Sequence, residues 1–69
     1  MRLSTRNQLK GVVESVDLSE AMAVVRVKVG ENVFTSSITR AAAQDLGLAE
    51  GKDVYILIKS TDVQLGVDD

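Results

Sequence analysis

The chain has 69 residues, which is enough for one small domain and too few for two. Because it contains no cysteine and no histidine, disulfides, thiolate or imidazole metal ligands and catalysis by a histidine base are excluded. A net charge of −2, with one Phe, one Tyr and no Trp, argues against nucleic-acid binding, which uses basic surfaces and aromatic stacking. We therefore expect residues 1–69 to form a single domain that is not an enzyme.

Membrane association and export are not expected either. No segment approaches the roughly 18 consecutive apolar residues of a membrane span, and residues 1–4 turn polar before a signal-peptide core could form. The carboxylates are scattered over turns, the predicted helix and the tail, where acids are usually solvated surface charges. We expect a cytoplasmic protein without a membrane partner.

Short runs of β-branched residues, separated by Gly, Asn, Asp and Ser, predict a mainly β protein. In the second run, apolar residues from Ala23 to Val29 occupy every other position, and Arg26 and Lys28 lie between them. This alternation is typical of a strand with one buried face. A tight hairpin loop is expected at residues 30–32, because Gly and Asn tolerate a positive φ. Five strands are predicted, over residues 8–16, 22–29, 33–38, 53–59 and 63–67.

One helix is predicted over residues 39–47, which are rich in good helix formers. Thr39 suits the N-cap, since its hydroxyl can accept a free backbone N–H of the first turn, and Gly47 suits the C′ position. Five strands with one short helix between the third and fourth fit a small Greek-key barrel of the oligonucleotide/oligosaccharide-binding (OB) type. In such a barrel the helix closes one end.

The fourth predicted strand indicates an oligomer. Residues 54–58 are apolar on both faces, so the outward side chains of Tyr55 and Leu57 need a cover. A domain of 69 residues without disulfides or metal is also marginal by itself. A second subunit is the economical cover, and the alternative is that these two residues are simply exposed at an edge.

Two runs of donor-bearing side chains suggest an anion site. Residues 4–11 carry hydroxyl, guanidinium, amide and ammonium groups where the first strand begins, and Ser4 and Arg6 point the same way on an extended chain. Residues 59–62 place a cation and two hydroxyls where an apolar strand ends. The alternative is that both runs are solvated rims and turns, and Asp62 is expected to fix its turn by accepting backbone N–H bonds.

These two runs, with residues 35–39 and 46–52, resemble the molbindins, small molybdate-binding proteins, over essentially the whole chain. The most specific parts are S-x-R-N-Q at residues 4–8 and K-S-T-D at residues 59–62. The resemblance implies a five-stranded OB-like barrel, assembled as a homohexamer (a trimer of dimers with strand exchange), that binds molybdate or tungstate between subunits. The same module forms the effector domain of molybdate-responsive regulators and is related to the accessory domain of transporter ATPases.

The resemblance also implies a set of oxyanion-binding residues divided between two subunits. One subunit would supply the start of its first strand, and its neighbour the end of its fourth. Thr39 matches a hydroxyl contact of related modules, whereas Ala42 stands where some relatives have a serine, so one hydroxyl contact is absent. The implied residues are Ser4, Arg6 and Asn7 from the first strand, Lys59 and Ser60 from the fourth, and Thr39.

The donor chemistry of these residues suits the ligand. Molybdate is a tetrahedral dianion whose oxygens only accept hydrogen bonds, so its site needs guanidinium, ammonium, hydroxyl and backbone N–H donors. A carboxylate would repel the dianion, and two cations would neutralise it. No protein atom is expected to bind the metal directly, and no organic cofactor is expected. Sulfate carries the same charge, so only the size of the cavity can reject it.

The leading hypothesis is a free-standing protein that binds molybdate for storage or buffering. The alternative keeps the same module as the sensory domain of a molybdate-responsive regulator or of a molybdate transporter ATPase. A nucleic-acid-binding OB fold is the remote alternative.

Overall fold

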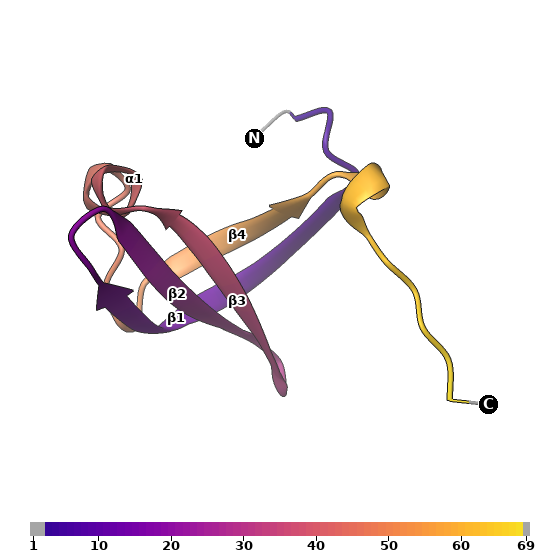
Figure 1. Ribbon diagram of the computed structural model, residues 1–69. Helices are drawn as coiled ribbons and strands as arrows, with labels where there is room; N and C mark the ends of the chain where they lie inside the picture. Colours follow the sequence, from indigo (N-terminus) through magenta and orange to yellow (C-terminus); the bar gives the residue numbers. More distant parts are fainter. Residues whose placement is uncertain (1–2, 69) are drawn as a thin grey trace.

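The computed structural model describes residues 3–68, which form a twisted antiparallel sheet with one short helix (Figure 1). The sheet has four strands in the order β3-β2-β1-β4. The mainly β fold with one short helix between the third and fourth strands is therefore confirmed. The elements are β1 (Asn7–Leu18), β2 (Met22–Val29), β3 (Asn32–Thr39), the helix α1 (Arg40–Asp45), β4 (Asp53–Ile58) and the 3-10 turn η1 (Ser60–Asp62).

The long strand β1 belongs to two different parts of the molecule. Its residues 12–18 pair with β2, and its residues 7–12 pair with β4. The two halves meet at Val12, and at the adjacent Gly11 an added Cβ would lie 2.7 Å from Val27 Cγ1 and 2.8 Å from the Lys28 carbonyl oxygen. The β1/β4 pair projects as an arm from the body made of β1, β2 and β3 (Figure 1). A residue without a side chain is thus required where the arm leaves the body.

The core lies in the body and is small. The alternation predicted for the second strand is confirmed, because Ala23, Val25 and Val27 are buried while Lys28 is exposed. The helix closes one end of the sheet as predicted and buries Ala43. Its N-terminus is capped by Thr39, whose hydroxyl oxygen accepts the Ala42 backbone N–H at 3.1 Å. The buried apolar residues of the described chain are Val13, Ala23, Val25, Val27 and Ala43.

The fifth predicted strand is absent from the described residues. After η1 the chain runs away from the sheet as an extended tail (Figure 1), and residues 63–67 pair with no strand of the same chain. Leu65 and Val67 are 94% and 82% exposed. Residues 63–67 have an apolar pattern typical of a strand, but the backbone N–H and C=O groups of a strand need hydrogen-bond partners on a neighbouring strand. Within one chain the tail reaches no such strand. The prediction of five strands is wrong for the single chain.

The single chain is consequently not a closed, compact barrel. Its Cα radius of gyration is 13.1 Å, whereas a compact chain of this length has a radius of about 11 Å. An open apolar groove of about 220 Å³ is lined by residues of β2, β3 and β4 and of the segment that follows α1. Tyr55 and Leu57 are 55% and 44% exposed, as expected for the outward face of β4. The apolar groove is lined by Val25, Val27, Ile38, Leu48, Val54 and Ile56, among others.

Candidate functional site

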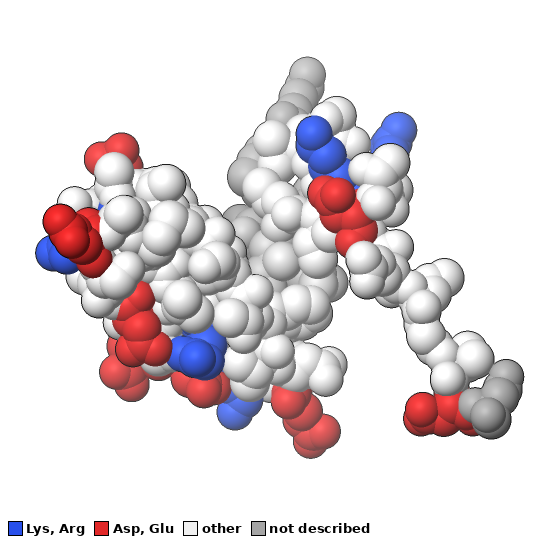
Figure 2. Space-filling model, viewed as in Figure 1, with Lys and Arg blue, Asp and Glu red and all other residues white. Residues whose placement is uncertain are grey.

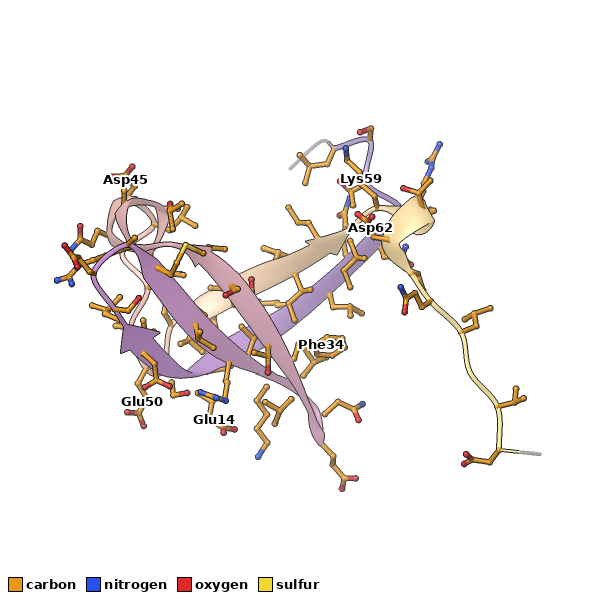
Figure 3. All side chains as sticks on the ribbon, viewed as in Figure 1. Glu14, Phe34, Asp45, Glu50, Lys59 and Asp62 are labelled. Carbon is orange, nitrogen blue, oxygen red and sulfur yellow. The ribbon has the colours of Figure 1, made fainter. Side chains whose placement is uncertain are left out.

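The two donor-bearing runs meet at the free end of the arm. Asn7, the first residue of β1, pairs with Ile58, the last residue of β4. The register therefore places residues 4–6, which precede β1, beside residues 59–60, which follow β4. Figure 3 labels Lys59 at this end, and the N-terminal segment passes next to it. Runs separated by some fifty residues in sequence are brought together by one antiparallel pairing.

Within residues 3–68, the cations at the arm end have no acidic partner within salt-bridge distance. Among residues 3–68 the structure contains one ion pair, between Arg26 and Asp17 at 2.8 Å in the body. Arg6 and Lys59 are exposed, and neither side chain makes a hydrogen bond or ion pair with another residue of the described chain, so their N–H donors can serve another ligand. Figure 2 shows Lys and Arg groups at this end with an acidic group nearby, whereas the visible face of the body carries mostly acids. We call the region of residues 4–6 and 59–60 the arm-end site.

Two side-chain amides hold the backbone around the arm-end site. The Asn7 side chain, which is partly buried, donates from Nδ2 to the Ile58 carbonyl oxygen at 3.2 Å. The Gln8 side chain donates from Nε2 to the Thr5 carbonyl oxygen at 2.9 Å. The resemblance to the molbindins implies that Asn7 is an anion donor and implies no role for Gln8. Two adjacent amide side chains at the start of a strand could have indicated a structural role. Which carbonyl groups accept their hydrogen bonds depends on the strand pairing, which the sequence does not show.

The turn that follows β4 is held by its backbone. The Asp62 N–H donates to the Lys59 carbonyl oxygen at 2.9 Å, and the Val63 N–H donates to the Ser60 carbonyl oxygen at 3.4 Å. No hydrogen bond of the Asp62 carboxylate occurs within the described chain. The expectation that this carboxylate fixes the turn is therefore wrong, because the 3-10 hydrogen bonds already close it. Figure 3 places Asp62 beside Lys59.

Thr39 lies at the opposite end of the molecule. It ends β3, pairs with Met22 at the start of β2 and caps α1, far from η1 (Figure 1). Met22 lies beyond the Leu18 end of β1, whereas the arm-end site lies before its Asn7 end. With a rise of about 3.3 Å per residue, the length of β1 separates the two by on the order of 30 Å. The sequence-predicted residues thus fall into two places, and one ion cannot contact both within a chain.

The groups gathered at the arm end suit an anion. Within residues 3–68 no three or more His, Cys, Asp or Glu side chains gather in a group able to hold a metal ion. The same residues contain no helix that is long and apolar enough to cross a membrane. What the arm end presents is a guanidinium, an ammonium and hydroxyl groups, all of which donate hydrogen bonds.

Comparison with known proteins identifies the family of this chain. The TOBE domain matches residues 3–65, which is nearly the full sequence. The chain belongs to the TOBE-domain family. A probable molybdenum-pterin-binding protein from Haemophilus influenzae is 42% identical over 69 residues, covering 99% of this chain and 100% of the relative.

Solved structures confirm the fold of this TOBE domain. A molybdate-binding protein from Sporomusa ovata superposes with a TM-score of 0.93 at 27% identity, covering 97% of this chain and 100% of its own. The cytoplasmic molybdate-binding protein ModG, with molybdate bound, gives a TM-score of 0.93 at 36% identity, covering 99% of this chain and 49% of its own. The molbindin resemblance inferred from the sequence motifs is confirmed, and with it the OB-like fold.

Proposed function

We propose that this TOBE-domain protein binds molybdate, and by the same chemistry tungstate, at the arm-end site. The observation that carries the proposal is the pairing of Asn7 with Ile58, which unites the two donor-bearing runs of the sequence. The full-length similarity to a probable molybdenum-pterin-binding protein and the fold shared with two molybdate-binding proteins support it.

The donors of the arm-end site match a tetrahedral dianion. The Arg6 guanidinium and the Lys59 ammonium balance its two negative charges, and the hydroxyls of Ser4 and Ser60 donate to its remaining lone pairs. A wholly deprotonated anion is favoured over anions that carry a proton, because this set contains no carboxylate to accept a hydrogen bond from that proton. Asp62 must keep its carboxylate outside the shell, since it would repel the dianion.

A second copy of the chain completes the site in this proposal. All four donors are exposed in the single chain, where water weakens each charged contact. The exposed Leu65 and Val67 of the tail and Leu57 of β4 need a cover, and together their burial would stabilise an assembly by several kcal/mol, at about 1.5–3 kcal/mol for each side chain. We propose a homohexamer, a trimer of dimers, in which the arm-end site of one subunit meets that of its neighbour, so that both subunits contribute donors.

Thr39 is proposed to contact an oxyanion at a different place in the assembly. Its hydroxyl oxygen accepts the Ala42 N–H but its own proton remains available for donation. Ala42 offers no hydroxyl here, so this second contact has fewer donors than the arm-end site. The function that follows is storage or buffering of molybdate in the cytoplasm, without an enzymatic step, an organic cofactor, or a nucleic-acid or membrane partner.

Isothermal titration calorimetry with sodium molybdate, and with sulfate and phosphate at the same ionic strength, tests the function. We expect saturable binding of molybdate that at least tenfold excesses of sulfate and phosphate do not displace. Native mass spectrometry of the same samples gives the number of subunits and of bound ions together. A protein that takes up no molybdate, or that takes up sulfate equally well, would contradict the proposal.

A further inference from the structure

The two amide side chains next to the arm-end site lie where each donor run joins the sheet. β1 begins at Asn7 and β4 ends at Ile58, at the same end of the sheet. These two residues therefore have sheet neighbours on one side only along their strands. Strand ends open more readily than strand centres, because fewer contacts and hydrogen bonds hold them. Residues 4–6 and 59–60 continue from these strand ends and share their conformational freedom. A site built there needs something to hold its backbone.

Asn7 holds the fourth-strand side of the site. Its Nδ2 donates to the Ile58 carbonyl oxygen, on the residue immediately before Lys59, across a separation of 51 residues in sequence. The Asn7 side chain is partly buried, which makes this hydrogen bond stronger than one in open water. The bond uses one of the two N–H groups of the amide and directs it toward β4. It therefore ties the start of the Lys59–Ser60 segment to β1.

Gln8 holds the first-strand side. Its Nε2 donates to the Thr5 carbonyl oxygen at 2.9 Å, so the side chain folds back over the bend that contains Ser4, Thr5 and Arg6. Adjacent residues of a strand point to opposite faces, so the two amides act on different segments without competing. Each donor run is thus connected to β1 by its own amide hydrogen bond.

We propose that Asn7 and Gln8 are positioning residues of the oxyanion site, Asn7 for Lys59 and Ser60, and Gln8 for Ser4 and Arg6. This inference rests on the proposed function. The amides act before the ion arrives, by reducing the conformational freedom that the donor runs must lose when they close around it. Neither amide needs to touch the ion, and direct contact of Asn7 with molybdate is the competing explanation.

The test is a crossed set of double-mutant cycles measured by calorimetry with molybdate. Asn7→Leu and Gln8→Leu remove the donors while keeping similar side-chain volume, and each should weaken binding about threefold to tenfold. In the Lys59→Ala background the effect of Asn7→Leu should largely disappear, whereas in the Arg6→Ala background it should persist. Gln8→Leu should show the reverse pattern. General destabilisation would lower affinity equally in both backgrounds.

The matched control is Gln44→Leu, which replaces an exposed amide of α1 whose side chain makes no hydrogen bond within residues 3–68. Its affinity should equal that of the wild type. A readout without molybdate is the backbone order parameter of residues 59–60 from NMR relaxation, which should fall in Asn7→Leu and not in Gln8→Leu.

The outcomes separate this inference from the function on which it rests. If the wild type binds no molybdate, the proposed function fails and the inference with it. If the wild type binds but Asn7→Leu costs the same in both backgrounds, Asn7 contacts the ion or acts only on stability, and the positioning role is overturned. Unchanged order parameters in Asn7→Leu would overturn it as well. The crossed pattern, with the loss of order, supports it.

Discussion

The junction between the arm and the body gives a sharp stability prediction. In Gly11→Ala the new methyl would lie 2.7 Å from Val27 Cγ1, 2.8 Å from the Lys28 carbonyl oxygen and 2.8 Å from Val29 Cγ2. One of these atoms belongs to the paired backbone of β2, which cannot rotate away as a side chain can. Since Gly11 does not have a positive φ, the effect is purely steric.

The size of the destabilisation follows from overpacking a close contact between two neighbouring strands. Forcing one methyl into a filled space costs about 1–3 kcal/mol, which exceeds the gain of about 0.4–1 kcal/mol from a less flexible unfolded chain. For a domain of this size each kcal/mol lowers Tm by about 4–8 °C, so we expect a decrease of roughly 5–15 °C. Thermal unfolding by circular dichroism, at equal chain concentrations for all variants, measures it.

Gln44→Ala is the control for this substitution. Gln44 is exposed on α1 and its side chain makes no hydrogen bond within residues 3–68, so the Tm of this variant should stay within about 2 °C of the wild type. A Gly11→Ala protein with the Tm of Gln44→Ala would refute the reasoning, because it would mean that β1 and β2 separate at this point without cost. The same variant should also bind molybdate more weakly, since the arm leaves the body there.

Three further predictions concern binding and assembly. Arg6→Ala and Lys59→Ala should each weaken molybdate binding at least about tenfold in calorimetry, since a charge-assisted hydrogen bond contributes about 1.5–3 kcal/mol. The control Lys10→Ala, which removes an exposed cation of the same arm, should change the affinity little, and equal affinities for all three variants would contradict the arm-end site. Leu57→Asp should reduce the assembly to smaller species in gel filtration and lower its Tm, because the 44% exposed side chain is proposed to lie in an interface; an unchanged size and Tm would remove it from that interface. Thr39→Ala should lower the free energy of unfolding by about 1 kcal/mol through loss of the helix cap while leaving the arm-end affinity intact; an affinity loss as large as that of Arg6→Ala would place Thr39 in the same site.

Local patterns in the sequence determined the elements of this protein. The alternation in residues 22–29 predicted both the strand and its buried face, because the period of two is a property of the extended backbone itself. The helix and its Thr39 cap were predicted from residues within one turn of each other. The donor-rich runs, with the motifs that resemble the molbindins, indicated an oxyanion ligand, because guanidinium, ammonium and hydroxyl donors suit an anion whose oxygens only accept hydrogen bonds.

Only the tertiary structure decided how those elements combine. The tail at residues 63–67 has the composition of a strand but pairs with none in its own chain, since pairing depends on a free sheet edge within reach. The hydrogen bond from Asn7 to the Ile58 carbonyl and the requirement for glycine at Gly11 both arise from pairings between distant segments. The same register separates Thr39 from Lys59. A local pattern of residues predicts which face of a strand is buried. The partner strand and the register depend instead on which pairing gives the whole chain the lowest free energy.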